Sequence, residues 1–273
     1  MNAIVHSLRW HVATFDAKAA ATLALVPLLS LGYLRMFQAG HPDPTVMDAF
    51  VGALEPSKSI PLLWFLCPLL TMYRLVHMWK MREGYAVVAR FSGRLSLGVA
   101  AVTDVVVVSF VFSLILVASL AVLGFLLLGQ FENFQLATSE FARNTNGATL
   151  ASFPIVPAMA ILFAYSFLAL LFVNAAFCLA RTVLGDKWGI AIMALLNLPA
   201  VHGRDSFVYD LMHNISGGSM SVPNLLSLLY ESASVWYSSW LPGQTHHLLL
   251  LFGFVVILAG ACVASFSRRD WLG

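Results

Sequence analysis

The stretch AAVTDVVVVSFVFSLILVASLAVLGFLLLG, from Ala100 to Gly129, decides the class of fold. It carries one charged residue, Asp104, and is otherwise almost entirely apolar. Apolar runs of about 18 or more residues are typical of membrane-spanning helices, because lipid cannot hydrogen-bond an exposed backbone and a helix satisfies its own peptide groups. We therefore expect this stretch to cross a bilayer as a helix.

The composition extends this expectation to the whole chain of 273 residues. Hydrophobic residues make up 60% and charged residues 10%, whereas an ordinary soluble domain carries about 25% charged residues. We expect an all-α integral membrane protein with a single membrane domain and six spans. The six predicted spans are Ala19–Met36, Ile60–Met78, Ala100–Gly129, Phe153–Leu179, Trp188–His202 and Leu248–Phe266.

The distribution of basic residues predicts the orientation, since lysine and arginine stay on the cytoplasmic side of short loops. An even number of spans puts both termini in the cytoplasm of a multi-pass protein of the cell membrane. The net charge of +2 is then a signal of topology and gives no indication of nucleic-acid binding. The basic residues on the predicted inner side are Arg9, Lys18, Arg74, Lys80, Arg82, Arg90, Arg94, Arg181, Lys187, Arg268 and Arg269.

Two segments outside the spans are predicted to be helical. Residues 1–18 contain Val5, Leu8, Val12 and Phe15 at helical spacing, which predicts an interfacial helix on the inner surface or, as the alternative, a helix packed on another protein. Residues 204–247 form too long a connection to lack structure. We expect two short helices in the outer leaflet there, with a seventh span as the alternative.

Several kinds of catalytic motif are absent from the sequence. It has no GxxxxGK[ST] phosphate loop, no HExxH zinc pair and no GxSxG nucleophile elbow. Cys67, Cys178 and Cys262 fall inside predicted spans without a CxxC spacing, so we interpret them as small apolar residues. We expect no enzyme activity, metal or cofactor on this chain.

Polar residues inside spans are costly in lipid and are therefore candidates for function. Asp104, Asn174 and Asn197 are such residues. Asp104 either pairs with a basic residue such as Arg94 or Arg181 near the inner surface, or relays protons. The two asparagines either bridge neighbouring helices or contact a substrate.

The main cytoplasmic loop, predicted at residues 79–98, contains a second amphipathic segment. Arg82 and Glu83 flank an apolar set formed by Tyr85, Val88 and Phe91. This spacing predicts a short helix whose apolar face contacts either a cytosolic partner or the lipid surface.

This layout resembles the permease subunit of type-2 ABC exporters. The resemblance covers a surface helix before the first span, a charged loop after the second, an irregular outer segment before the sixth, and the ending Phe266-Ser267-Arg268-Arg269-Asp270. The best local match is Arg82-Glu83-Gly84 followed by Arg90-Phe91-Ser92-Gly93-Arg94 and Asp104. In this sequence Gly93 separates Ser92 from Arg94, and Asp104 stands where the family commonly has lysine.

The resemblance implies a division of labour between two kinds of chain. This chain would form part of an export pathway for a hydrophobic or amphipathic substrate such as a peptide, drug or lipid. A separate cytosolic ABC ATPase would carry ATP and Mg²⁺ and contact Arg82, Glu83, Tyr85, Val88 and Phe91. The permease would pair as a homodimer or with a similar permease. A membrane immunity or sensor protein without pumping activity is the alternative, and an intramembrane enzyme is the third hypothesis.

Overall fold

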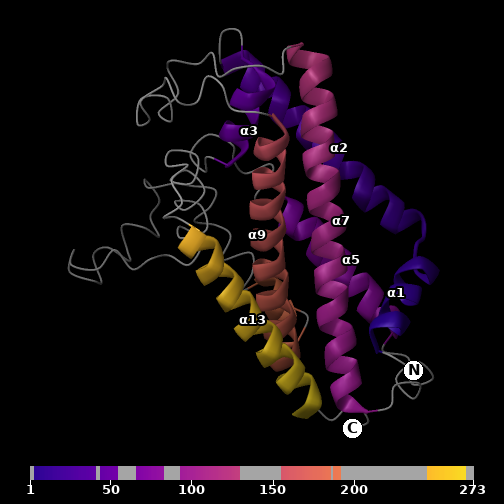
Figure 1. Ribbon diagram of the computed structural model, residues 1–273. Coiled ribbons are helices and arrows are strands. Elements are labelled where there is room, and N and C mark those ends of the chain that lie inside the picture. Colours follow the sequence, from indigo (N-terminus) through magenta and orange to yellow (C-terminus); the bar gives the residue numbers. More distant parts are fainter. Residues whose placement is uncertain are drawn as a thin grey trace.

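The fold is organised around one long helix, α7 (Arg94–Leu128), which contacts every other labelled helix (Figure 1). This is a computed structural model, and it describes residues 3–40, 44–54, 66–82, 93–129, 155–185, 187–191 and 245–268. Within these residues the structure is entirely helical, without strands. The all-α prediction is confirmed for this part of the chain.

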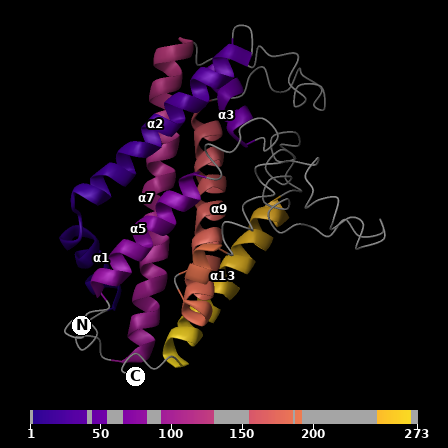
Figure 2. The ribbon, with the colours of Figure 1, turned by 180° about the vertical axis from the view of Figure 1, so that it is seen from behind.

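The other helices surround α7 at different heights. In Figure 1, α9 and α13 lie together beside α7, and α2 crosses it obliquely. The reverse view in Figure 2 shows α5 crossing α7 and α9 on the other side. The helices are α1 (Ala3–Ala13), α2 (Ala17–Gly40), α3 (Val46–Leu54), α5 (Cys67–Arg82), α9 (Ile155–Leu184) and α13 (Thr245–Arg268).

Three of these helices are long and apolar enough to cross a membrane. They are α2, α7 and the Leu162–Leu184 part of α9. The Phe252–Phe266 part of α13 is apolar but shorter, and α5 has 16 residues, short of the about 20 that a span needs. The described structure is therefore compatible with a membrane protein.

Local hydrogen bonds and a glycine in the left-handed conformation mark the ends of α7. Ser96 donates from its hydroxyl to the carbonyl oxygen of Gly93 at 2.6 Å, in the first turn. Gly129 ends the helix in the left-handed region, with φ of 70°, and its N–H donates to the carbonyl of Phe125. The predicted span began at Ala100; the helix begins six residues earlier because a helix continues through polar residues once its first turn is closed.

The contacts between helices define their directions. Ser109 and Phe110 of α7 contact Asn174 and Phe167 of α9, while Asp104, nearer the start of α7, lies close to Trp79, which stacks beneath Arg181 near the end of α9. Thus α9 runs antiparallel to α7.

The last helix also runs antiparallel to α7. A Cβ atom added to Gly98, in the second turn of α7, would lie 3.0 Å from the Cα atom of Val263 and 3.2 Å from Cβ of Phe266, near the end of α13. Ser7 of α1 reaches the same end of α7, where its hydroxyl donates to the carbonyl of Ala100 at 3.5 Å. The described beginning and end of the chain therefore lie at one end of the bundle.

The helix α3 was not predicted, because the sequence analysis left the stretch between the first two spans without structure. Thr45 and Asp48 form a reciprocal cap: the Asp48 N–H donates to the Thr45 hydroxyl at 3.2 Å, and the Thr45 N–H donates to Oδ2 of Asp48 at 2.9 Å. This pairing satisfies free amide groups at a helix start. Phe50 of α3 is fully buried, and Val46 packs against Gly124 of α7.

The predicted loop at 79–98 was too long. The α5 helix continues to Arg82 and α7 begins at Arg94, since the charges that lowered the local hydropathy lie on helical turns. The predicted contact residues Glu83, Tyr85, Val88 and Phe91 fall outside the described residues. So does most of the predicted fifth span and all but the last three residues of the 204–247 segment.

Candidate functional site: a buried polar junction around Asp104

The carboxylate of Asp104 is the centre of a polar junction between four helices. Asp104 lies ten residues after Arg94, the first residue of α7, which is about 15 Å along the helix axis. Its side chain is fully buried. A buried carboxylate is strongly unfavourable unless it is paired and hydrogen-bonded, so its neighbours decide whether the charge is tolerated.

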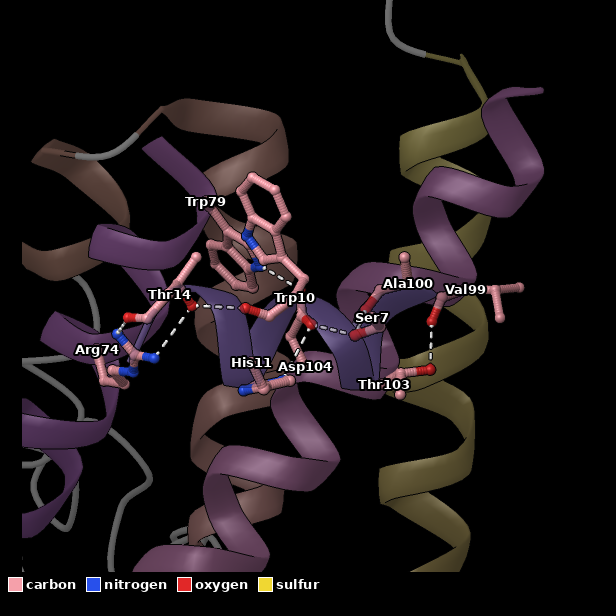
Figure 3. Close-up of polar contacts among 10 residues, drawn as sticks. All are labelled: Ser7, Trp10, His11, Thr14, Arg74, Trp79, Val99, Ala100, Thr103 and Asp104. Carbon is pink, nitrogen blue, oxygen red and sulfur yellow. Dashed lines mark hydrogen bonds and ion pairs between the residues drawn. The ribbon is translucent and has the colours of Figure 1, made fainter. Parts of the chain in front are cut away.

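Three side chains from two other helices contact this carboxylate (Figure 3). Ser7 of α1 donates its hydroxyl to Oδ1, and Trp79 of α5 donates its indole N–H to Oδ2 at 3.1 Å. Nε2 of His11 lies 3.1 Å from Oδ1, in an electrostatic contact that is not aligned as a hydrogen bond. Asp104 thus joins α1 and α5 to α7.

The ring of Trp79 links the carboxylate to a buried arginine. The guanidinium carbon of Arg181, on α9, lies 4.8 Å from the centre of the Trp79 ring, and Arg181 is only 4% exposed. Phe177 stacks on Trp79 with the ring centres 6.1 Å apart. A cation over an indole face is attracted by the ring quadrupole. Arg181, one of the two partners expected for Asp104, therefore belongs to the same cluster through Trp79.

A second arginine holds the end of α1. Arg74 of α5 donates to the carbonyl oxygen of Thr14 at 3.2 Å and to the Thr14 hydroxyl at 3.2 Å. The last carbonyls of a helix have no partner within it, and a cation there is favoured by the helix dipole. Arg74 is buried and fixes α1 against α5.

The corner between α1 and α2 adds an ion pair at the edge of the junction. Nε2 of His77 lies 2.9 Å from Oδ2 of Asp16. Oδ1 of Asp16 accepts the N–H of Ala19 at 2.8 Å and so caps α2. The Ala19 N–H and, next, the hydrogen bond with His77 lower the pKa of Asp16 below its usual value.

A separate polar cluster surrounds Asn174 of α9, at the level of Ser109, which lies five residues after Asp104 on α7. Thr71 of α5 donates its hydroxyl to Oδ1 of Asn174 at 2.9 Å, and the Asn174 amide donates to the hydroxyl of Ser109 at 3.0 Å. All three side chains are fully buried. Asn174 therefore bridges α5, α7 and α9, and its amide groups are engaged with protein.

The structure brings together only part of the predicted site. Asp104 and Asn174 lie on neighbouring helices at different heights, in separate clusters. Arg82 ends α5, while Asn197 lies outside the described residues. Sequence reasoning missed Ser7, His11, Thr14, Arg74 and Trp79. The available signal was the spacing of Ser7, His11 and Thr14, which places three polar residues on one face of the helical segment.

No protein-family model, curated protein or solved structure matches the chain.

Proposed function

We propose that this chain is a six-span protein of the cell membrane with both termini in the cytoplasm. Support comes from helix direction: α2 and α7 run one way, and α5, α9 and α13 run the other (Figure 1). If α9 and α13 both span and are parallel, the chain must cross the membrane an odd number of times between them. The predicted fifth span, Trp188–His202, supplies one such crossing.

Charge supports the same orientation. The end of the bundle that holds the Asp104 junction also carries exposed Arg9, Lys18, Lys80, Arg94 and Lys187. Basic residues accumulate on the cytoplasmic side. We therefore assign this end to the cytoplasm, with α1 at the inner membrane surface.

We further propose that the chain is the permease subunit of an ATP-driven exporter for a hydrophobic or amphipathic substrate, working with a separate cytosolic ABC ATPase. The resemblance of the layout motivates this proposal, and the structural observation that supports it is the hydrogen bond between Trp79 and Asp104, which ties α5 to α7. Trp79 lies three residues before the end of α5 and Asp104 ten residues after the start of α7. The two helices that flank segment 83–92 in the sequence are thus joined by a direct hydrogen bond.

This arrangement gives a physical route for coupling. A force on segment 83–92 would act on the ends of α5 and α7. The Trp79–Asp104 hydrogen bond opposes separation of these ends, so the two residues would move with their helices unless the bond breaks. Movement of Trp79 would reach α9 through Arg181, and movement of Asp104 would reach α1 through Ser7. A second permease, identical or similar, would complete the substrate pathway.

Copurification tests the proposal. The tagged protein should retain an ATPase with a phosphate-binding loop, identified by mass spectrometry, after extraction from its native membrane. Tyr85→Ala combined with Phe91→Ala should lose most of it, because aromatic anchors dominate interfaces. Ala39→Ser is the control variant, since Ala39 lies at the end of α2 that is remote from the Asp104 junction. This variant should retain the ATPase. Equal recovery of ATPase with both variants, or no ATPase with the unmodified chain, would contradict the proposal.

A further inference from the structure

The helix α1 has its polar face turned inward and its apolar face turned outward. Ser7 is fully buried and Thr14 is 6% exposed, whereas Val12 on the opposite face is 79% exposed and Phe15, just after the helix, is 58% exposed. This is the reverse of a helix on a water-soluble protein. The exposed apolar residues are Ile4, Val5, Leu8, Val12 and Phe15.

The inward face cannot roll outward without breaking the polar junction. Ser7 is held by Asp104, and Thr14 by the two hydrogen bonds from Arg74. The apolar face is therefore held outward by bonds on the opposite side of the helix. Apolar side chains exposed to this extent favour contact with a non-aqueous neighbour.

The charges around this face indicate what that neighbour is. Arg9 lies at the edge of the apolar face and Lys18 follows it at the start of α2, and both are exposed. The one acidic residue between them, Asp16, is engaged by His77 at 2.9 Å and by the N–H of Ala19 at 2.8 Å. The two cations outnumber this one carboxylate, so the rim of the apolar face carries a net positive charge.

We propose that the outer face of α1, together with Arg9 and Lys18, binds the anionic phospholipid surface of the leaflet at this end of the bundle. The apolar side chains enter the acyl region and the two cations contact headgroup phosphates, as in amphipathic helices that lie in the plane of a membrane. The inference rests on the membrane topology proposed above and is independent of the transport role.

The expected preference for anionic lipid follows from the two cations. Each lysine or arginine near an anionic surface favours binding by roughly fivefold, so two together give roughly 30-fold. The hydrogen bonds of the polar face with Asp104 and Arg74 should be the same in every lipid composition. The fraction of time that the outer face is exposed to water should be lower in anionic lipid.

The experiment measures the exposure of Val12 in the full-length chain. Val12→Cys is introduced with Cys67, Cys178 and Cys262 replaced by Ala, and the protein is placed in nanodiscs of phosphatidylcholine alone or with one quarter phosphatidylglycerol. The rate of modification by an uncharged water-soluble maleimide is then compared between the two discs. Ala39→Cys, exposed at the far end of α2, corrects for any effect of composition on the reagent.

We expect phosphatidylglycerol to slow modification of Val12→Cys several-fold, up to the 30-fold estimated above. Arg9→Gln with Lys18→Gln should abolish this dependence. Arg35→Gln, which removes an exposed cation on the far half of α2, should leave it intact. The single variants Arg9→Gln and Lys18→Gln should each reduce the slowing by phosphatidylglycerol by about half on a logarithmic scale. Such graded, additive reductions are expected from loss of charge, whereas misfolding would speed modification in both kinds of disc.

The two ways of failing are distinguishable. Slow modification that is equal in both discs would place the helix in lipid but overturn the anionic preference, and it would leave the topology standing. Rapid modification in both would overturn the lipid surface and the placement of α1 together, and would favour a protein partner on this face.

Discussion

Replacing Asp104 by Ala should destabilise the protein more than any conservative change nearby. The variant removes the acceptor of the Trp79 indole N–H and of the Ser7 hydroxyl. Ser7 retains the carbonyl of Ala100 at 3.5 Å as a substitute, whereas the structure describes no second acceptor for the buried Trp79 N–H among the residues it covers. The two orphaned donors cost about 1–3 kcal/mol each.

Because Ser7 keeps a partial substitute, we expect a loss of about 2–4 kcal/mol in the free energy of unfolding. For a chain of this size each kcal/mol corresponds to about 2–4 °C in Tm, so the shift should be roughly 4–16 °C. Asp104→Asn should cost less, about 1–2 kcal/mol, because one amide oxygen still accepts from Trp79 and only the charge is lost. Thr103→Ala is the adjacent control: its hydroxyl bonds only the Val99 carbonyl, at 2.8 Å.

The assay is thermal unfolding of the purified protein in detergent, followed by intrinsic fluorescence. A double-mutant cycle with Trp79→Phe isolates the Trp79–Asp104 contribution, and contacting residues usually couple by about 0.5–3 kcal/mol. If Asp104→Ala unfolded within 1 °C of Thr103→Ala, or if the cycle showed no coupling, the junction would not hold these helices together.

Three further variants probe other contacts. Gly98→Leu should push α7 away from α13, because even a Cβ atom added at Gly98 lies 3.0 Å from Val263. The free energy of unfolding should fall by about 1–3 kcal/mol. Gly253→Ala, where an added Cβ meets open space, should be nearly neutral, and equal stability of the two variants would refute this packing. Asn174→Leu should cost about 1–2 kcal/mol by removing two buried hydrogen bonds, measured as a lower Tm; an unchanged Tm would contradict the bridging role. The pKa of Asp16 is lowered in the folded protein, so this carboxylate should contribute stability above about pH 4 that is lost as the pH falls through its folded pKa. Asp16→Asn should flatten the dependence of Tm on pH between about pH 5 and 3. An unaltered profile of Tm against pH would show that the carboxylate is not engaged.

Hydropathy located the long apolar helices α2, α7, α9 and α13 but not their ends. The run from Ala100 to Gly129 predicts the end of α7 well, because Gly129 both ends the apolar run and adopts the left-handed conformation that stops a helix. The start was misplaced because Arg94 and Ser96 are polar yet helical. The free-energy cost of placing Arg94 and Ser96 in a helix is small where the helix lies beyond the acyl region of the proposed membrane.

The site was harder to predict than the fold because its contacts are remote in sequence. Asp104 was recognisable as a costly charge in an apolar run, but its partner Ser7 is 97 positions away. Trp79 was assigned to a loop because basic residues follow it. The α3 helix could have been recognised from the pairing of Thr45 and Asp48, a capping pattern with aspartate in place of the usual glutamate.

The proposed transport role requires the Asp104 junction and segment 83–92 to face the cytoplasm. Labelling of intact cells with a membrane-impermeant maleimide tests this most directly, with single cysteines at Lys187 and Ala39, two exposed positions at opposite ends of the bundle. We predict that Ala39→Cys reacts in intact cells and that Lys187→Cys reacts only after the membrane is opened. Reaction of Lys187→Cys in intact cells, or equal reaction at both positions, would contradict the topology on which the proposed function depends.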